Sequence, residues 1–313
     1  MHKPKVFVSD YVHPSLLTRL TEVGYDLDYL PNISYKQFLA IIKNYQGFVI
    51  NSKIKMNRAA IDKLDSTLFI ARLGSGLDII DLEAAAEKNI AVYSAPEGNR
   101  NAVAEHAVGM LLSLFNNLRT AHNSVLDFSW ERELNRGTEI EGKTIGIIGY
   151  GNTGSAFASK WAGWDVNVLV YDKYESGFAD SDSYITECDL ETLLTKSDVI
   201  SIHLQLTDET DMMVNDAFLS KMKKNSVLIN TSRGKIVDTA ALHRALRSGH
   251  LSGCCLDVLE IERMNQLNNA TKTLYNSLFN MNNVILSPHI AGWTHKSLEK
   301  IANVLADKII NKP

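Results

Sequence analysis

The segment from Lys143 to Asp172 constrains the fold of this chain more than any other segment. An apolar, strand-like run at 143–149 (KTIGIIG) leads into three glycines with the spacing G-x-G-x-x-G, and a helical stretch opens at the last of them. A second strand-like run, at 167–172 (NVLVYD), ends in an acidic residue. A strand, a glycine turn, a helix and a second strand make up the βαβ unit of a doubly wound parallel sheet. The segment therefore predicts an α/β fold.

Each glycine of this turn meets a separate physical demand. Gly149 allows a tight turn, Gly151 lets the backbone approach a pyrophosphate, and Gly154 permits close packing of the helix on the strand. The N-terminus of the helix adds free N–H groups and a positive dipole end. We therefore predict that the turn binds a dinucleotide through Gly149, Tyr150, Gly151, Asn152, Thr153 and Gly154. The alternative is a glycine turn that binds no nucleotide.

Asp172 bears on which dinucleotide is bound. Its carboxylate can accept hydrogen bonds from the adenosine ribose hydroxyls, and its charge would repel a 2′-phosphate. The predicted cofactor is therefore NAD and not NADP. Lys173, the next residue, is a cation that could soften this discrimination.

The rest of the chain alternates between strand-length apolar runs and helix-length stretches, as expected for parallel sheets. In the first third, strands are expected at 6–9, 25–30, 47–50, 68–72 and 90–94, and helices at 14–23, 35–44, 57–64 and 79–88. Six further strands are expected at 143–149, 167–172, 199–204, 227–231, 253–258 and 284–288.

Three other stretches carry weaker expectations. Pro96, Gly98 and Asn99 break the pattern, and a long apolar helix is expected to begin near Asn101. The polar, Asn-rich stretch at 264–283 is expected to be a surface loop. A last helix is expected at about 295–310, where it could pack on either domain.

Composition excludes several functional classes. The net charge of −4 and the pI near 6.1 give no electrostatic case for a nucleic acid or a membrane surface as a partner. No apolar run is long enough to span a membrane, and the start, MHKPKVFVSD, does not have the pattern of a signal peptide. Three cysteines fit neither a disulfide framework nor a metal site, and the histidines share no metal-ligand spacing. A cytoplasmic protein without a metal is predicted.

Polar residues follow three of the later apolar runs, where the carboxyl ends of parallel strands would line a ligand crevice. Hydride transfer to a 2-oxo acid needs a cation for the carboxylate, a proton donor for the oxygen and a carboxylate that raises the pKa of that donor. Arg233 and His289 supply the first two, and either Glu260 or Glu262 supplies the third. Taken singly, each could be an ordinary surface or half-buried side chain.

These motifs carry a resemblance to a known family. RLGSGLDIID (72–81), SAPEGNRNAVAEHAVGMLL (94–112), EGKTIGIIGYGNTG (141–154), NTSRGKIVD (230–238), CLDVLEIE (255–262) and LSPHIAG (286–292) together resemble the D-isomer-specific 2-hydroxyacid dehydrogenases. The resemblance implies two Rossmann-like domains with the cofactor cleft between them. Residues 1–98 plus 293–313 would form the substrate domain and 99–292 the NAD-binding domain. It also suggests a homodimer built partly on the helix near Asn101.

By motif position, the resemblance implies a role for each candidate residue. Arg233 corresponds to the substrate-binding arginine, His289 to the acid/base and Glu262 to its partner. Asp257 is placed like the aspartate that holds the nicotinamide carboxamide, and Ser75 and Gly76 like backbone donors to the substrate carboxylate. Further cofactor contacts are implied for His203, Thr207, Thr231 and Gly292. Lys53 lies where members acting on phosphoglycerate carry basic residues, although Asn51 replaces a frequent arginine. Two departures are Arg263, where proline is common after the glutamate, and Gln205, where proline is common in HLQLT.

The predicted activity is interconversion of a D-2-hydroxy acid and its 2-oxo acid with NAD. Glyoxylate, hydroxypyruvate, phosphohydroxypyruvate and bulkier 2-oxo acids all stay open as substrates. A dinucleotide-sensing, corepressor-like protein on the same fold is the main alternative, although it would need none of the three reacting residues. Formate dehydrogenases resemble the family too, but they have glutamine in place of Glu262.

Overall fold

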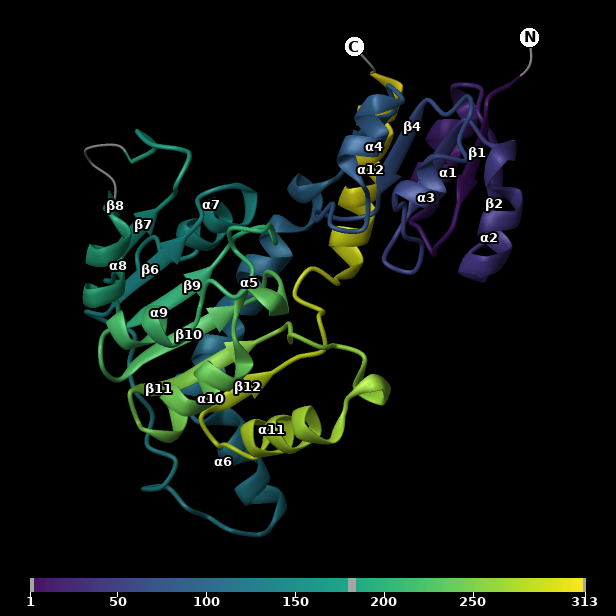
Figure 1. Cartoon of the computed structure of the whole chain (residues 1–313). Helices are drawn as coiled ribbons and strands as arrows, with labels where there is room; N and C mark the ends of the chain where they lie inside the picture. Colours follow the sequence, from purple (N-terminus) through teal and green to yellow (C-terminus); the bar gives the residue numbers. More distant parts are fainter. Residues whose placement is uncertain (1–2, 180–183, 312–313) are drawn as a thin grey trace. The chain divides into compact units, whose positions relative to one another are not determined.

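The structure, a computed structural model, describes residues 3–179 and 184–311. The chain divides into two compact units (Figure 1). Unit 1 comprises Met1–Arg100 and Trp293–Pro313, and unit 2 comprises Asn101–Gly292. Each unit has its own parallel sheet, so the predicted α/β class with two doubly wound sheets is confirmed.

Unit 1 contains a five-stranded parallel sheet in the order β2-β1-β3-β4-β5. Its strands are β1 (Lys5–Val8), β2 (Asp26–Tyr29), β3 (Gly47–Ile50), β4 (Phe69–Arg72) and β5 (Ala91–Tyr93). Its helices are α1 (Pro14–Glu22), α2 (Tyr35–Ile41), α3 (Arg58–Ile61), α4 (Leu82–Glu87) and α12 (His295–Ile310), with a 3₁₀ turn η1 (Ile42–Asn44). Alternate side chains of β1 enter different cores, since Phe7 packs with residues of α2 and Val6 with residues of α1 and α12. Helices therefore cover both faces of the sheet, as a buried parallel sheet requires.

Helix α12 belongs to unit 1, although it follows unit 2 in the chain. Ile301, Leu305 and Ile309 recur at helical spacing and are buried in one core with Val8 and Leu16. Thr294 begins the helix with a capping box, in which the Thr294 and Ser297 side chains bond each other's backbone N–H groups.

Unit 2 contains a seven-stranded parallel sheet in the order β12-β11-β10-β9-β6-β7-β8. Its strands are β6 (Thr144–Ile148), β7 (Asn167–Tyr171), β8 (Ile185–Glu187), β9 (Val199–Ile202), β10 (Ser226–Asn230), β11 (Leu251–Leu256) and β12 (Val284–Leu286). The order reverses between β6 and β9, which is the topological switch point where doubly wound sheets bind their ligands. Strand β8 is additional to the six predicted strands, because three residues of mixed polarity leave no apolar run to detect.

Helices lie on both faces of this second sheet as well. The helices of this part of the chain are α5 (Pro96–Phe115), α6 (Leu118–Leu126), α7 (Asn152–Ser159), α8 (Leu190–Lys196), α9 (Asp216–Lys221), α10 (Thr239–Arg247) and α11 (Asn269–Phe279), with 3₁₀ turns η2 (Gly234–Ile236) and η3 (Met264–Gln266), and α6 has no buried residues. The first residues of α5 belong to unit 1. Cys254 and Cys255 are fully buried in β11, an interior strand, where they fill space as small apolar side chains.

The predicted start of the long helix was wrong. Helix α5 begins at Pro96, five residues before Asn101, because proline at the first helical position needs no hydrogen-bond partner and has a helical φ. Gly98 is also inside the helix, where a Cβ would lie 2.7 Å from the backbone nitrogen of Ile301. Asn117, at φ 49°, separates α5 from α6.

The predicted surface loop at 264–283 was also wrong, since it contains the helix α11. Asn268 caps this helix by accepting a hydrogen bond from the Thr271 N–H. Tyr275 and Leu278, three residues apart on this helix, are its buried side chains. The asparagine-rich composition concealed a short apolar stripe.

Within residues 3–179 and 184–311, no helix is both long enough and apolar enough to cross a membrane.

Candidate active site

The candidate residues of unit 2 share one edge of its sheet. Each follows the carboxyl end of a parallel strand: Gly149 follows β6, Asp172 β7, His203 β9, Thr231 and Arg233 β10, Asp257 β11, and His289 β12. Because all seven strands are parallel, these ends meet at the same edge, where open α/β sheets bind ligands.

At two positions of the glycine turn between β6 and α7, a residue with a side chain would clash. Gly149 has a φ of +91°, and a Cβ there would lie 2.5 Å from the His203 carbonyl oxygen. At Gly154 a Cβ would lie 1.9 Å from the Gly149 carbonyl oxygen. These contacts bring the first turn of α7 against the end of β6.

Gly151 differs from the other two glycines, because nothing lies within 4 Å of the place a Cβ would occupy. Gly151 is also the N-cap residue of α7, so no side-chain oxygen at this position bonds the first N–H groups of the helix. An open approach to helical N–H groups is the arrangement that binds phosphate. These residues therefore fit the pyrophosphate of a dinucleotide. Asn152 and Thr153 form the first turn of α7, and the Tyr150 ring stacks on Phe178 with centroids 4.3 Å apart.

The Asp172 carboxylate is held by backbone donors. It accepts hydrogen bonds from the N–H groups of Tyr150 at 2.7 Å, Tyr174 at 2.9 Å and Glu175 at 3.1 Å. Burial opposes ionisation of this carboxyl group, but the three N–H donors outweigh it and lower its pKa. Asp172 is therefore a fixed negative charge beside the glycine turn.

Lys173 does not stand alone beside Asp172. Its ammonium group lies 2.6 Å from Glu209 Oε1, and the hydroxyl of Tyr174 donates to the other oxygen of the same carboxylate. All three side chains are exposed. The cation that could have softened discrimination against a 2′-phosphate is thus already paired.

The three remaining predicted cofactor contacts near β9 and β10 differ in exposure. His203 is buried, its Nε2 lies 2.9 Å from Ser201 Oγ, and burial lowers its pKa to about 3, so the ring is neutral. His203 Nδ1 and Thr231 Oγ1 are buried without a hydrogen-bond partner within the described part of the chain. Thr207 is exposed, and its N–H donates to Thr210 Oγ1 at 2.8 Å.

The side chains of His289 and Glu262 are in hydrogen-bonding contact. His289 Nδ1 lies 2.9 Å from Glu262 Oε1 and 3.1 Å from Oε2, and each side chain is 45% exposed. Glu260 is placed elsewhere, with Oε2 accepting from the Thr239 N–H at 3.4 Å. Of the two glutamates that the sequence left open, Glu262 is the one in contact with His289.

The backbone of His289 is held in a left-handed conformation, with a φ of 57°. Residues with a side chain adopt this conformation at a cost, so neighbouring contacts must maintain it. The His289 N–H donates to the Asp257 carbonyl at 2.7 Å, and the Asp257 carboxylate accepts from the N–H groups of Ile290 at 2.9 Å and Ala291 at 2.8 Å. Asp257 therefore fastens the segment that carries His289.

Two further residues, which sequence reasoning missed, complete this arrangement. Ser287 Oγ donates to Asp257 Oδ1 at 2.6 Å, and His106 Nε2 on α5 lies 2.8 Å from the same hydroxyl. The Asp257 side chain is fully enclosed as a result, with 0% exposed. A single sequence could not reveal this contact, because His106 and Ser287 are 181 positions apart.

Arg233 lies in a short turn after β10. The Asn230 side chain bonds both ends of this turn, donating to the Arg233 carbonyl at 2.9 Å and accepting from the Ser232 N–H at 3.0 Å. At Gly234 a Cβ would lie 1.9 Å from the Leu259 carbonyl oxygen. The arginine turn is thus packed against the segment that leads from Asp257 to Glu262. Gly292, the remaining predicted contact, is the last residue of unit 2.

The predicted substrate residues of unit 1 also follow strand ends. Ser75 and Gly76 come after β4, and the Ser75 hydroxyl donates to Asn99 Oδ1 at 2.7 Å. Lys53 comes after β3, donates to the Pro31 carbonyl and lies 3.6 Å from Asp10 Oδ1.

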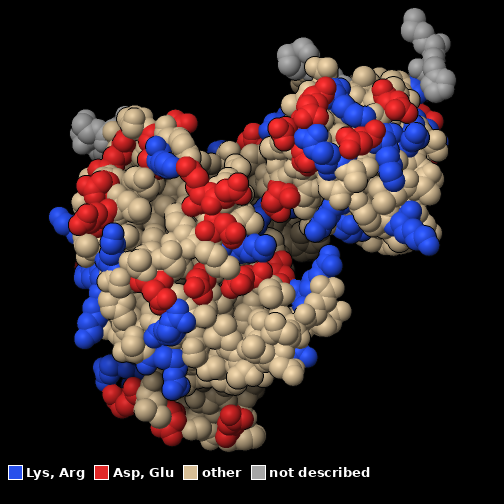
Figure 2. Space-filling view, viewed as in Figure 1, with Lys and Arg blue, Asp and Glu red and all other residues tan. Residues whose placement is uncertain are grey.

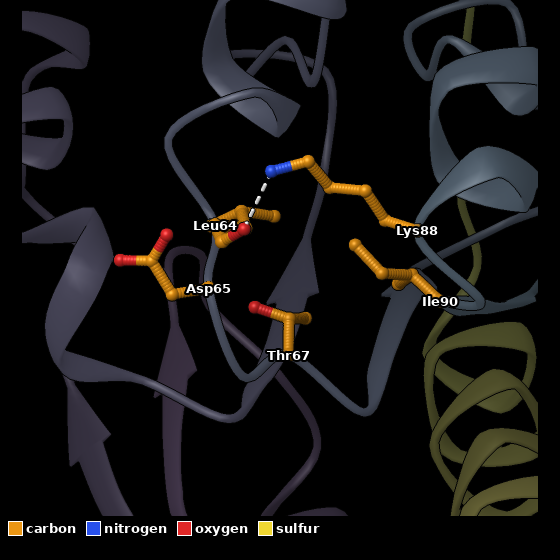
Figure 3. Close-up of a pocket in the computed structure, with 5 residues that line it drawn as sticks. All are labelled: Leu64, Asp65, Thr67, Lys88 and Ile90. Carbon is orange, nitrogen blue, oxygen red and sulfur yellow. Dashed lines mark hydrogen bonds between the residues drawn. The ribbon is translucent and has the colours of Figure 1, made fainter.

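A cavity of about 270 Å³ in unit 1 lies at the opposite edge of the same sheet (Figure 3). It is lined by Leu64, Asp65, Thr67, Lys88 and Ile90, which precede β4 and β5. The Lys88 ammonium group donates to the Leu64 carbonyl at 2.6 Å and does not reach into open space. This cavity contains none of the candidate residues.

Comparison with known proteins shows which family the chain is similar to. Residues 108–291 match the model of the D-isomer specific 2-hydroxyacid dehydrogenase, NAD binding domain. Over 307 residues the chain is 31% identical to D-3-phosphoglycerate dehydrogenase of Archaeoglobus fulgidus, covering 98% of this chain and 57% of that protein. It is 34% identical to glyoxylate reductase of Thermofilum pendens, covering 99% and 91%. The chain spans little more than half the length of the phosphoglycerate dehydrogenases it matches.

A solved structure agrees with these relatives. D-lactate dehydrogenase of Aquifex aeolicus, determined with NAD and lactic acid, superposes with a TM-score of 0.83 at 30% identity, covering 98% of this chain and 94% of that one. The resemblance found in the sequence motifs is confirmed, and the chain belongs to the D-isomer-specific 2-hydroxyacid dehydrogenase family.

Proposed function

We propose that this protein interconverts a D-2-hydroxy acid and its 2-oxo acid with NAD. The contact of His289 with Glu262 carries the proposal, because a histidine held by a carboxylate at a ligand-binding sheet edge is suited to proton transfer. The glycine turn and Arg233 follow strands of the same sheet.

In this proposal, Arg233, His289 and Glu262 have different tasks. A nicotinamide dinucleotide held at the glycine turn would provide the hydride chemistry in either direction. The Arg233 guanidinium binds the substrate carboxylate and polarises the carbonyl group. His289 gives a proton to the carbonyl oxygen from Nε2, since Nδ1 faces Glu262. Glu262 orients the ring and stabilises its protonated form.

The fixed charge of Asp172 supports NAD over NADP. A 2′-phosphate at the end of β7 would meet this carboxylate, and Lys173 is already paired with Glu209. A preference for NADPH in turnover would contradict this choice of cofactor.

We assign substrate binding to unit 1, with Ser75, Gly76 and Lys53 at the carboxyl edge of its sheet. The pairing of Lys53 with Asp10 favours an unphosphorylated 2-oxo acid, because the cation is already partly neutralised. Faster turnover of phosphohydroxypyruvate than of hydroxypyruvate would overturn this preference.

A homodimer is part of the proposal. Apolar side chains on and after α6 are exposed: Leu118 (55%), Val125 (53%), Leu126 (63%), Phe128 (100%), Trp130 (79%) and Leu134 (79%). Exposed apolar side chains gathered in one segment are typical of association surfaces. Both acidic and basic side chains lie on the face shown in Figure 2, and the net charge of −4 gives no electrostatic case for a nucleic acid or a membrane surface as a partner. Three free cysteines fit a reducing, cytoplasmic compartment.

Turnover by the purified protein tests the proposal. NADH and NADPH oxidation would be followed spectroscopically with pyruvate, glyoxylate, hydroxypyruvate, phosphohydroxypyruvate and 2-oxoisocaproate. We expect NADH-dependent turnover, and we expect Arg233→Ala and His289→Gln each to lower kcat/KM by roughly 10²–10⁴-fold while NADH still binds. Binding of NADH without turnover of any 2-oxo acid would favour the dinucleotide-sensing alternative.

A further inference from the structure

We infer that Tyr275 is a positioning residue for the acid–base pair, which it serves by fixing the backbone next to Glu262. The inference rests on the proposed function, because it assigns Tyr275 a role in the reaction through Glu262 and His289.

The contact itself is a two-sided hydrogen bond. The Tyr275 hydroxyl accepts from the Ile261 N–H at 2.9 Å and lies 3.4 Å from the Ile261 carbonyl oxygen, to which it donates. One hydroxyl group thus engages both backbone polar groups of the residue that precedes Glu262.

The segment around Glu262 needs such an anchor because it lacks regular structure. Between the end of β11 and η3, residues 257–263 form neither helix nor strand. Gly234 packs against the start of this segment at Leu259, and the Gln266 N–H bonds the Arg263 carbonyl at its far end. Between those points the side chains of Ile261 and Glu262 are partly exposed, at 36% and 45%.

The Tyr275 ring provides a rigid base for this hydrogen bond. Tyr275 is 2% exposed, and its ring lies 5.3 Å from that of Phe279 on the same helix. Burial raises the pKa of Tyr275, the Ile261 N–H opposes this, and the negative charges of Glu260 and Glu262 raise it again. The net shift of the Tyr275 pKa is upward, so the phenol keeps its proton at neutral pH.

The position of Glu262 should control how strongly the protonated His289 ring is stabilised, because the two side chains are in contact at 2.9 Å. A carboxylate beside Nδ1 stabilises the imidazolium, and the benefit falls as the carboxylate moves away. The other charged groups nearby have contacts of their own: Asp257 accepts from the Ile290 N–H, His106 lies 3.6 Å from Asp257, and Glu260 accepts from the N–H of Thr239, whose side chain also bonds the Tyr275 hydroxyl.

The test compares Tyr275→Phe with Tyr184→Phe in the whole protein. Tyr184 is a matched control, because its hydroxyl also donates to a backbone carbonyl of unit 2, that of Ala158 at 2.9 Å. We expect Tyr275→Phe to lower kcat about tenfold and to move the pH–rate profile of kcat/KM to lower pH by roughly half a unit to one unit. NADH affinity should stay within about twofold, since no contact near the glycine turn changes. Tyr184→Phe should leave the profile unchanged.

Glu262→Gln separates failure of this inference from failure of the proposed function. If Glu262→Gln leaves the pH–rate profile unchanged, the proposed acid–base pair is wrong. If Glu262→Gln shifts the profile and Tyr275→Phe behaves like Tyr184→Phe, only the role of Tyr275 is wrong. In the double variant, Tyr275→Phe should cause no further shift.

Amide hydrogen exchange of the unaltered protein gives a second test that does not depend on folding of a variant. The Ile261 N–H should exchange more slowly than the exposed amides that follow it, because its acceptor is buried. Exchange of Ile261 as fast as that of Arg263 would overturn the inference.

Discussion

The glycine turn and the acid–base segment share one edge of the unit 2 sheet, yet they are held in different ways. The turn at 149–154 is shaped by the absence of side chains, and its tightest contact joins Gly149 and Gly154, five residues apart. The segment at 257–291 is shaped by hydrogen bonds between distant residues, such as Asp257 to Ala291 and Tyr275 to Ile261. A local spacing can encode the first geometry, whereas the second needs the folded sheet to bring its parts together.

Asp257→Asn is the strongest way to break the second geometry. The amide would place an NH₂ group where the carboxylate now accepts hydrogen bonds from Ser287, Ile290 and Ala291. We expect kcat to fall about 100-fold through displacement of His289, and the free energy of unfolding to fall by roughly 3 kcal/mol. Steady-state kinetics and urea unfolding measure the two effects.

Asp198→Asn is the matched control for that variant. Asp198 precedes β9, at the other edge of the sheet, and accepts from the Thr144 N–H at 2.9 Å. This variant should lose stability and keep its kcat. A normal kcat in Asp257→Asn as well would show that the His289 segment does not depend on Asp257.

Comparing Gly154→Ala with Gly151→Ala tests whether the two glycines have different roles in the turn. A Cβ at Gly154 would meet the Gly149 carbonyl oxygen at 1.9 Å, so we expect a loss of roughly 3 kcal/mol in unfolding free energy. A Cβ at Gly151 has nothing within 4 Å, so the loss of unfolding free energy should stay near the roughly 1 kcal/mol that alanine costs at an N-cap. NADH affinity should fall because the methyl group occupies the approach to the α7 N–H groups. Calorimetry and NADH titration measure both variants, and equal destabilisation by the two would contradict this division of roles.

The His203 carbonyl oxygen lies against Gly149 of the glycine turn. Of the changes at Asp257, Gly154 and His203, the one at His203 should have the smallest effect on the free energy of unfolding. Burial lowers the pKa of His203 to about 3, below the ordinary value of 6.5, so the unfolded chain binds a proton between these pH values and the folded chain does not. The contribution of neutral His203 to the free energy of unfolding should therefore be fully present above pH 6.5. It should decrease as the pH falls, by about 2 kcal/mol between pH 7 and pH 5.

His203→Gln should remove this part of the pH dependence, as measured by urea unfolding at both pH values. If the variant and the unaltered protein lose the same free energy between pH 7 and pH 5, His203 is already charged in the folded state.

Much of the architecture was predictable from patterns that are local in the chain. The six strands expected in unit 2 and the helix at 295–310 are all present, because alternation of apolar runs is a property of neighbouring residues. The errors fell where composition conceals periodicity or context reverses a preference. The asparagine-rich stretch at 264–283 forms α11, and Pro96 begins a helix that it was expected to precede.

The sequence by itself determined the βαβ order, the glycine turn and the family, because each depends on the spacing of residues close together in the chain. Only the tertiary structure decided that Asp257 fastens the His289 segment and that Tyr275 reaches Ile261. These contacts join separate strand ends, loops and helices across 14 to 34 residues. Their geometry exists only once hydrophobic burial has brought the parallel strands into one sheet.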